Sequence, residues 1–368
     1  MKKLLLDFRH ISERNGFQSV LKMILKAIIT DNKNEYYLLI NHEDEYLIKQ
    51  IKNRENIKLL YIKSKPFSFF QNIEIPYTML RNNIKILFHI NFDIPCFIFC
   101  VPNYKLIATI HDLIPIKYPE INKKSFIKQI YFGIMFKICT ILSQYIMTVS
   151  EFSKKDIIDF LKVSEKKITV IHNSFEALNP LSLSADSNKE YNENPILLFV
   201  GNNFAYKNIH TVIDAVKILR DKNVIVKFNI AGGKKEYTNF LETKIQEYKL
   251  ENQIKILGKV NDEELQILYK TSDIYVFPSL LEGFGIPLLE AMNAGIPIIS
   301  SNRTCLPEIA GDAAILINPT AENFALKIKE LIDNPQLKDE LIKKGYIRIK
   351  NFTQEKYSEK ILNFYNKI

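Results

Sequence analysis

Cysteine is scarce in this chain of 368 residues and is not arranged for metal binding. There are four cysteines, none forms a Cys-x-x-Cys pair, and none lies near a histidine at the spacing of metal ligands. This pattern excludes a disulfide scaffold and a cysteine-based zinc site, and it is typical of reduced thiols in the cytoplasm. We therefore expect a cytoplasmic protein.

The sequence also lacks a long apolar run. A membrane span needs about 18 uncharged apolar residues, and no segment reaches that length. The first apolar run, Leu4–Leu6, is followed at once by Asp7 and Arg9, so it predicts a β-strand and not a signal peptide. The longest candidate, Ile130–Met147, contains Lys137, which would cost about 2.5–3.5 kcal/mol in a bilayer. We expect no membrane-spanning helix.

Glycine is nearly absent from the first half of the chain. Only Gly16 and Gly133 precede residue 200, whereas nine glycines follow it. Because glycine lets the backbone approach a ligand closely, we expect a phosphate-binding site in the second half.

Charge is as uneven as glycine. Residues 1–175 contain 26 lysines and arginines against 16 aspartates and glutamates, a formal charge of +10, and the remainder contains 24 against 25. A basic first half indicates an anionic partner such as lipid headgroups, a diphosphate-bearing acceptor or nucleic acid. A solvated lysine-rich surface is the alternative.

Short β-branched runs alternate with helical patterns along the whole chain, which predicts an α/β fold with parallel sheets. The polar segment 176–194 predicts a linker between two Rossmann-like domains, 1–175 and 195–350. Residues 351–368 predict a C-terminal helix that crosses back to the first domain. The expected strands are Lys3–Asp7, Tyr36–Ile40, Ile57–Tyr61, Ile84–His89, Leu106–Ile110, Tyr145–Val149, Ile168–Ile171, Ile196–Val200, Phe228–Ala231, Ile254–Leu257, Ile274–Phe277 and Pro297–Ser300.

The strongest motif runs from Pro278 to Gly295, where a predicted strand leads through two close glycines into a helix. Free backbone N–H groups and the helix dipole at such a turn favour phosphate. Two carboxylates flank the turn: Glu290, expected in the first turn of the helix, suits paired ribose hydroxyls, and Glu282 suits a sugar ring. The alternative is a helix cap for Glu290 and a solvated side chain for Glu282.

This E-G-F-G…E string, with G-I-P-I-I-S-S-N after it and L-P-E-I-A-G-D-A-A at Leu306–Ala314, resembles retaining glycosyltransferases of family 4. The resemblance covers most of residues 105–318. It implies the GT-B fold, in which two Rossmann-like domains face each other across a cleft. It places Glu282 near the donor sugar and Glu290 on the ribose. It implies backbone contacts to the donor from Gly283, Phe284 and Gly285.

A second part of the resemblance lies at Phe199-Val-Gly201-Asn-Asn-Phe-Ala-Tyr-Lys207. Family members have a glycine at this strand end and then a basic pair against the donor phosphates. Gly201 and Lys207 match the glycine and the lysine, and the arginine that usually precedes the lysine is missing. Preorganised cations stabilise the departing diphosphate, so Lys207 is expected to be catalytic.

Two matches fall in the first half. His111 follows a predicted strand, and family members often carry there a histidine that faces the donor sugar. A histidine beside Asp112 at the carboxyl end of a strand is also a reasonable polar site residue on its own. Gly16 matches the glycine of the family's first loop, where donor and acceptor approach, although relatives often have a glycine pair.

The resemblance implies transfer with retained configuration, because the departing diphosphate helps to deprotonate the acceptor hydroxyl on the same face. No Asp-x-Asp occurs, so we expect a metal-independent hexosyltransferase without a cofactor. The donor is expected to be GDP-mannose or a UDP-hexose. The acceptor is expected to be a glycan or a polyprenyl-diphosphate-linked glycan of O-antigen, capsule or lipopolysaccharide synthesis. The enzyme would lie in the cytoplasm, peripherally on the inner face of an anionic membrane.

Three other classes of protein share some of these features. A dinucleotide oxidoreductase needs Gly-x-Gly-x-x-Gly after its first strand, which the segment at Gly201 does not supply. A nucleotide-sugar epimerase could share the architecture. A basic surface binder of RNA or lipid would explain the charge but not the E-G-F-G…E string, so we expect no nucleic-acid partner.

Overall fold

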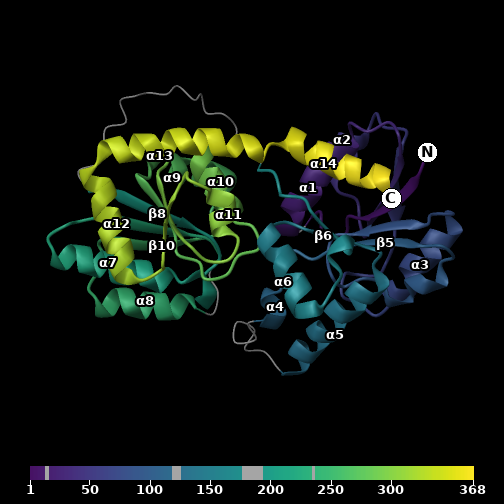
Figure 1. The fold of residues 1–368 in the computed structure, drawn as a ribbon, viewed down its shortest axis with the longest axis horizontal. Coiled ribbons are helices and arrows are strands. Elements are labelled where there is room, and N and C mark those ends of the chain that lie inside the picture. Colours follow the sequence, from purple (N-terminus) through teal and green to yellow (C-terminus); the bar gives the residue numbers. More distant parts are fainter. Residues whose placement is uncertain (13–15, 118–125, 176–193, 234–236) are drawn as a thin grey trace. The chain divides into compact units, whose positions relative to one another are not determined.

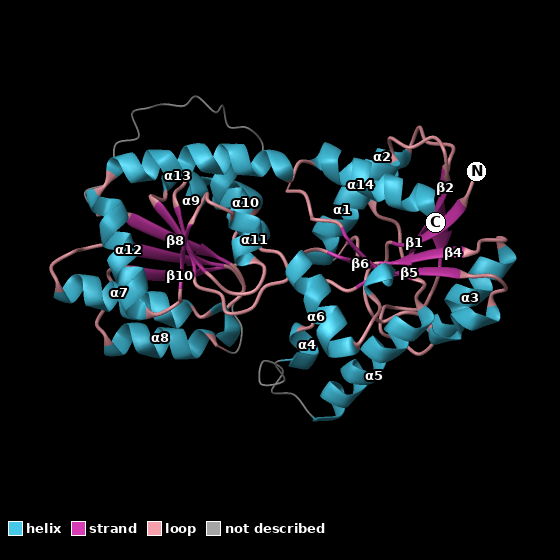
Figure 2. Cartoon of the chain, viewed as in Figure 1, coloured by secondary structure: helices cyan, strands magenta, loops and turns pink. Residues whose placement is uncertain are grey.

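The computed structural model describes residues 1–12, 16–117, 126–175, 194–233 and 237–368. The chain forms two compact units, Met1–Ser174 with Thr353–Ile368, and Phe175–Phe352. The predicted linker 176–194 lies outside the described residues except for Asn194. Each unit is a parallel sheet with helices on its faces (Figures 1 and 2). This confirms the prediction of two Rossmann-like units.

The first unit contains a seven-stranded parallel sheet in the order β3-β2-β1-β4-β5-β6-β7. Its strands are β1 (Lys3–Asp7), β2 (Glu35–Ile40), β3 (Ile57–Tyr61), β4 (Ile86–His89), β5 (Lys105–Thr109), β6 (Tyr145–Thr148) and β7 (Ile168–Val170). Its helices are α1 (Gly16–Ile28), α2 (Glu45–Ile51), α3 (Gln71–Arg81), α4 (Ile114–Lys117), α5 (Phe126–Leu142), α6 (Glu151–Leu161) and α14 (Gln354–Lys367), with short 3-10 turns η1 (Cys96–Cys100) and η3 (Glu165–Lys167). The central strands are nearly continuous apolar runs, as expected for parallel strands that are covered on both faces.

The last helix of the chain, α14, belongs to this first unit and packs beside α1 (Figure 1). Tyr365 is fully buried, and its ring lies 6.4 Å from that of Tyr36 on β2 and 5.6 Å from that of Phe88 on β4. The amide of Gln354 donates to the carbonyl oxygen of Met23 in α1 at 2.9 Å. The first sheet is therefore covered on part of one face by the last residues of the chain.

The second unit contains a six-stranded parallel sheet in the order β10-β9-β8-β11-β12-β13. Its strands are β8 (Ile196–Val200), β9 (Lys227–Ala231), β10 (Ile254–Gly258), β11 (Ile274–Phe277), β12 (Ile298–Ser301) and β13 (Ile315–Ile317). Its helices are α7 (Ile209–Asp221), α8 (Thr238–Glu247), α9 (Asp262–Thr271), α10 (Ile286–Asn293), α11 (Leu306–Ala310), α12 (Ala321–Asp333) and α13 (Pro335–Arg348), with 3-10 turns η4 (Ala205–Lys207) and η5 (Ile349–Asn351).

Local chemistry explains several helix ends. The Asn261 side chain accepts from the backbone N–H of Glu264, and the Glu264 side chain accepts from that of Asn261, so the two residues form a capping box at the start of α9. Ser150 caps α6 with a single hydrogen bond, which its side chain accepts from the backbone N–H of Ser153. Among the helices described, none is long and apolar enough to cross a membrane.

Candidate functional site

The candidate site of the second unit lies where β8 and β11 run side by side. Strand numbers increase outward from β8 in one direction and from β11 in the other, so the boundary between them is the topological switch point of the sheet. Loops that follow the carboxyl ends of strands at such a point form a crevice that binds ligands in open α/β sheets. The two loops at this point carry Lys207 and Glu282.

These two side chains form an ion pair. The Nζ of Lys207 lies 2.6 Å from Oε1 of Glu282, and the side chains are only 14% and 12% exposed. The same Nζ lies 5.3 Å from the ring centroid of Tyr206 and 5.7 Å from that of Phe277. A backbone hydrogen bond of 2.8 Å from Leu280 N–H to the Tyr206 carbonyl joins the two loops. The sequence predicted both charged residues, and the structure brings them together.

The segment that follows β12 holds the loop of Glu282 through hydrogen bonds. The backbone N–H of Glu282 donates to Oγ1 of Thr304 at 3.2 Å. The buried thiol of Cys305 donates to the carbonyl oxygens of Glu282 and Phe284, at 3.2 and 3.4 Å. The Phe284 ring is buried and packs edge-on against Phe352 at 5.8 Å. Only the main chain of Phe284 is therefore suited to contact a ligand.

Two buried glycines complete this turn, Gly283 and Gly285. Gly285 is the N-cap of α10 and has a left-handed backbone with φ of 94°. A Cβ there would lie 3.1 Å from Cδ2 of Leu306, so both the dihedral angle and the space favour glycine. Because the N-cap residue Gly285 has no side chain that could accept from the first N–H groups of α10, these groups are suited to an anion.

Glu290 is the fifth residue of α10. The expectation that it lies in the first turn is wrong, because the helix begins at Ile286 and Glu290 falls in the second turn. The Tyr269 hydroxyl donates to its Oε2 at 2.8 Å. Burial raises the pKa of Glu290, the Tyr269 hydrogen bond offsets part of that rise, and Asp262 adds to it, so the pKa stays above its ordinary value. Tyr269, on α9, is a partner that sequence reasoning missed.

The loop after β8 depends on a close approach of two glycines. The N–H of Gly201 donates to the Ala231 carbonyl at 2.8 Å, and a Cβ on Gly232 would lie 2.0 Å from the carbonyl oxygen of Gly201. The side-chain oxygen of Asn202 accepts from the N–H of Gly233 at 3.1 Å. Gly232 was not singled out from the sequence, although a Gly-Gly pair directly after a strand is a signal for such an approach.

Asn208 is a second residue that sequence reasoning missed as part of the site. It is buried, has a left-handed backbone with φ of 56°, and precedes α7. Its side chain donates to the Pro278 carbonyl at 3.2 Å and accepts from the Thr211 hydroxyl at 2.7 Å. It therefore ties the loop of Lys207 to the strand end that leads to Glu282. Asparagine tolerates the left-handed region, and that tolerance is the one signal in the sequence.

His111 and Gly16 lie in the first unit. The Nε2 of His111 donates to the Ile90 carbonyl at 3.0 Å. Burial lowers the pKa of His111 to about 4, against a small opposing effect of the Ile90 carbonyl, so the ring is neutral at physiological pH. Its ring lies 5.6 Å from that of Phe17, in an edge contact. Phe17 follows Gly16, where an added Cβ would meet no atom within 4 Å. Space alone therefore does not require glycine at position 16.

A buried charge network lies at the carboxyl ends of β1 and β4 in the first unit, and sequence reasoning did not find it. Asp7 pairs with Nη2 of Arg9 at 2.7 Å and with Nε2 of His89 at 2.9 Å. Arg9 also donates to the side-chain oxygen of Gln71 at 2.8 Å. Burial raises the pKa of Asp7, but Arg9 and His89 outweigh burial and hold that pKa well below its ordinary value. Asp7 and Arg9 are two residues apart, but nothing local in the sequence indicates the long-range contacts of this pair with His89 and Gln71.

Within the described ranges, no group of three His, Cys, Asp or Glu side chains is placed to hold a metal ion. Metal independence stays a prediction, because it concerns the reaction and not one arrangement of side chains.

Comparison with protein families gives two matches that together span most of the chain. Residues 183–348 match the profile described as "Glycosyl transferases group 1". Residues 35–176 match the profile described as "Glycosyltransferase Family 4".

Two curated proteins are similar to this chain. The O-antigen chain mannosyltransferase RfbU of Salmonella typhimurium is 33% identical over 214 residues, which are 58% of this chain and 57% of RfbU. The O-antigen chain mannosyltransferase B of Escherichia coli is 25% identical over 292 residues, which are 74% of this chain and 75% of that protein. The match thus spans little more than half of the length of RfbU.

Solved structures share the fold over the full length of the chain. Anabaena Alr3699/HepE in complex with UDP-glucose aligns with a TM-score of 0.76 at 17% identity, covering 100% of both chains. At this identity the likeness establishes the fold alone, and the two Rossmann-like units are those of the GT-B architecture.

Proposed function

Because this chain belongs to glycosyltransferase family 4, we propose that it transfers a hexose from a nucleotide-diphosphate sugar to a glycan acceptor. The names of the two similar mannosyltransferases support a role in the synthesis of a surface polysaccharide such as O-antigen, capsule or lipopolysaccharide. They also support GDP-mannose as the donor, while the UDP-glucose complex of the similar Anabaena structure supports a UDP-hexose.

The observation that carries this proposal is the ion pair between Lys207 and Glu282 at the switch point of the second sheet. The ammonium group is suited to a diphosphate and the carboxylate to sugar hydroxyls, and both lie in loops beside the N-terminus of α10. We propose that the donor opens the pair. Lys207 then turns to the diphosphate and Glu282 to the sugar ring.

The remaining donor contacts follow from the same loops. The backbone at Gly201, Gly283, Phe284 and Gly285 approaches the donor, and Gly16 does so from the first unit. The ionised carboxylate of Glu290 accepts hydrogen bonds from both ribose hydroxyls, and Tyr269 keeps that carboxylate in place. These contacts hold the donor in position before its bond to the sugar breaks. Such positioning lowers the barrier to sugar transfer.

Transfer occurs with retained configuration in this proposal. The bond between the anomeric carbon and the diphosphate oxygen breaks while the acceptor hydroxyl attacks from the same face. The proton of that hydroxyl passes to the departing diphosphate, and Lys207 balances the charge that develops there. Neutral His111, with its proton on Nε2, offers polar contacts to the sugar and no charge. Neither a metal ion nor a cofactor takes part.

The acceptor in this proposal is a glycan, carried on a polyprenyl diphosphate in the growing polysaccharide. The enzyme then works in the cytoplasm at the inner face of the membrane. The formal charge of +10 over residues 1–175 supports an anionic partner for the first unit.

The test is donor binding and transfer by three variants. A panel of GDP- and UDP-sugars is screened by thermal shift, and the best donor is titrated against Glu290→Gln, Glu282→Ala and wild type. We expect Glu290→Gln to weaken donor binding about tenfold, through loss of a charged acceptor of hydroxyl protons. We expect Glu282→Ala to lower kcat by about two to three orders of magnitude while nucleotide binding changes little.

Glu263→Gln is the matched control, because Glu263 is an exposed glutamate of the same unit. Turnover that is equal to wild type in both site variants would remove the site assignment. Incubation of the donor without any acceptor separates transfer from epimerisation, since only an epimerase would return an isomerised nucleotide sugar.

A further inference from the structure

The first unit exposes an unusual number of large apolar side chains along α3, η1 and α5. On α3 and the turn before it, five such side chains are at least half exposed: Phe69, Phe70, Ile73, Tyr77 and Leu80. Phe97 and Phe99 of η1 are also exposed. Single exposed apolar residues are ordinary, whereas a continuous patch marks an interaction surface.

Helix α5 extends the patch through one of its faces. Its exposed apolar residues are Ile127, Ile130, Tyr131, Ile134 and Ile141. They recur at intervals of three, four and seven residues, so they share one side of the helix. The opposite side packs into the core through buried Met135, Phe136 and Cys139. Packing within the described part of this unit does not account for an apolar stripe on the outer side of the helix.

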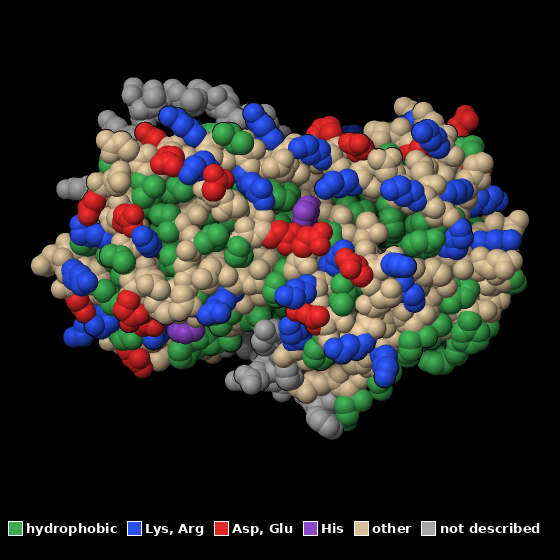
Figure 3. Space-filling view, viewed as in Figure 1, with side chains coloured by type: hydrophobic (Ala, Val, Ile, Leu, Met, Phe, Trp, Pro, Cys, Tyr) green, Lys and Arg blue, Asp and Glu red, His purple; other side chains and the backbone are tan. Residues whose placement is uncertain are grey.

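The three elements form one continuous surface. Phe69 contacts Phe70 and Phe97 edge-on with ring centroids 6.4 Å apart in each case, and Phe97 contacts Phe99 at 6.1 Å. η1 packs against both α3 and α5. Figure 3 shows the result as a band of apolar side chains over α3 and α5, with lysine and arginine side chains beside it. We call this surface the aromatic face.

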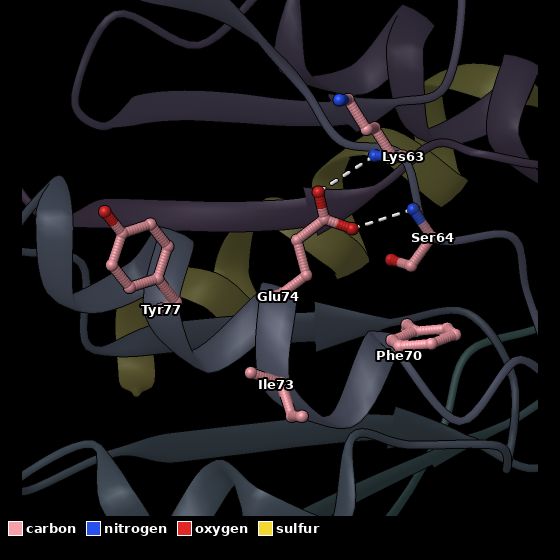
Figure 4. A pocket seen from close by; sticks show the side chains of 6 residues that line it. All are labelled: Lys63, Ser64, Phe70, Ile73, Glu74 and Tyr77. Carbon is pink, nitrogen blue, oxygen red and sulfur yellow. Dashed lines mark hydrogen bonds between the residues drawn. The ribbon is translucent and has the colours of Figure 1, made fainter.

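The aromatic face contains a hollow of about 400 Å³ beside α3 (Figure 4). Phe70, Ile73 and Tyr77 form its apolar wall. The carboxylate of Glu74 accepts from the backbone N–H groups of Lys63 and Ser64, at 2.9 and 2.7 Å. This acidic side chain is therefore occupied by the main chain, while the ammonium group of Lys63 stays exposed at the rim.

Cations surround the face and acids are few on it. Lys63, Lys65 and Arg81 flank α3, and Lys128 and Lys137 are exposed on α5. Neither η1 nor α5 contains an aspartate or glutamate. Aromatic and aliphatic side chains rimmed by lysine and arginine are the composition that binds the interface of an anionic bilayer, with the apolar groups inserted and the cations at headgroup level.

We propose that the aromatic face docks on an anionic lipid bilayer and inserts Phe69, Phe70 and Phe99 together with the outer stripe of α5. The inference rests on the proposed function, because a lipid-linked acceptor is what would bring this enzyme to a membrane. Two contributions act together: several large apolar side chains insert into the bilayer, and anionic headgroups attract several lysines. Stable peripheral binding requires more than one such contribution. The charge of the rim favours lipid over a second copy of the chain, whose own rim would repel it.

The test is sedimentation of the whole chain with vesicles of phosphatidylcholine, with and without phosphatidylglycerol. We expect binding that needs the anionic lipid and weakens as salt is raised from about 0.1 M to about 0.5 M. The double variant Phe99→Ser with Ile134→Ser should reduce partitioning about tenfold, because two exposed inserting groups are removed. The charge variant Lys128→Glu with Lys137→Glu should reduce it by a similar factor at low salt and by less at high salt.

Matched controls exist in the second unit. Ile267 and Leu326 are similarly exposed apolar residues, and Lys343 is an exposed lysine. Ile267→Ser with Leu326→Ser, and Lys343→Glu, should bind vesicles as wild type does. Equal binding by the Phe99/Ile134 variant and its control would overturn the proposal. So would equal binding to neutral and anionic vesicles, or a shift from dimer to monomer in that variant without any change in vesicle binding.

Transfer to a water-soluble acceptor analogue separates this proposal from the proposed function. The Phe99/Ile134 variant should keep wild-type kcat with the soluble acceptor and lose activity only with acceptor embedded in vesicles. A wild-type chain that binds anionic vesicles but transfers no sugar to any acceptor would refute the proposed function and leave the docking surface standing.

Discussion

The hydroxyl of Tyr269 fixes the orientation of the carboxylate that we assign to the ribose. It donates to Glu290 at 2.8 Å and offsets part of the rise in pKa that burial causes. In Tyr269→Phe this hydrogen bond is lost, so the pKa of Glu290 should rise further. Donor affinity should fall roughly threefold to tenfold near neutral pH, the range expected for one hydrogen bond.

The pH dependence of this effect has a definite sign. An acid with a raised pKa takes up its proton at a higher pH, and the protonated carboxyl accepts fewer hydroxyl protons. Donor affinity should therefore weaken as pH falls through the pKa of Glu290, and the midpoint should move upward in Tyr269→Phe. Calorimetric titration of the nucleotide over a pH series measures the affinity at each pH and the midpoint of its pH dependence. A midpoint that is the same in wild type, in Tyr269→Phe and in Glu290→Gln would contradict the assignment.

Single residues differ in how far the sequence could predict their contacts. Lys207 and Glu282 follow neighbouring strands, and parallel strands present their carboxyl ends at one edge, so their proximity was predictable. The contact between Tyr269 and Glu290, and the buried pair of Asp7 with His89, were not. These contacts depend on how side chains from separate elements fill one interior, and no local pattern encodes that choice.

Among the glycine-containing turns, the turn after β9 leaves the least room for an added side chain. A Cβ on Gly232 would lie 2.0 Å from the carbonyl oxygen of Gly201, so Gly232→Ala must displace the loop after β8, which leads to Lys207. We expect a loss of about 1–3 kcal/mol in the free energy of unfolding of the second unit, as for other overpacked sites. We also expect weaker nucleotide binding.

Gly258→Ala is the informative comparison for this prediction. Gly258 also has a positive φ, of 75°, but an added Cβ there meets no atom within 4 Å. The variant Gly258→Ala should therefore have a strained backbone dihedral angle but no steric collision. Urea unfolding and nucleotide titration of both variants separate the two effects, and equal nucleotide affinity in both would mean that the close approach of the glycines does not position the loop.

The elements themselves were largely predictable, because β-branched runs and helix caps are local signals. One strand was missed for a physical reason. Strand β13 has only three residues, and it is stabilised by pairing with β12, which periodicity cannot reveal.

At the scale of the whole molecule, α14 joins the end of the chain to the first sheet. Tyr365 is fully buried between this helix and the rings of Tyr36 and Phe88. Tyr365→Ala should lower the free energy of unfolding of the first unit by about 3–5 kcal/mol, the range for removal of a large buried aromatic side chain. Chemical denaturation followed by circular dichroism measures it.

Lys360→Ala is the control on the same helix, because Lys360 is exposed. It should change the stability by less than about 0.5 kcal/mol. A loss of similar size in both variants, or an unchanged stability in Tyr365→Ala, would contradict the assignment of this stability to the buried ring.

The second unit is an insertion within the first, since Met1–Ser174 and Thr353–Ile368 form one compact unit and the other unit, Phe175–Phe352, lies between them in the sequence. During synthesis the strands of the leading sheet emerge long before the helix that covers them. Until α14 leaves the ribosome, the apolar groups around Tyr36 and Phe88 lack their cover, and the nascent chain carries an incomplete first unit alongside a complete second unit. Chaperone dependence and degradation of truncated products should therefore concentrate on the half that is translated first.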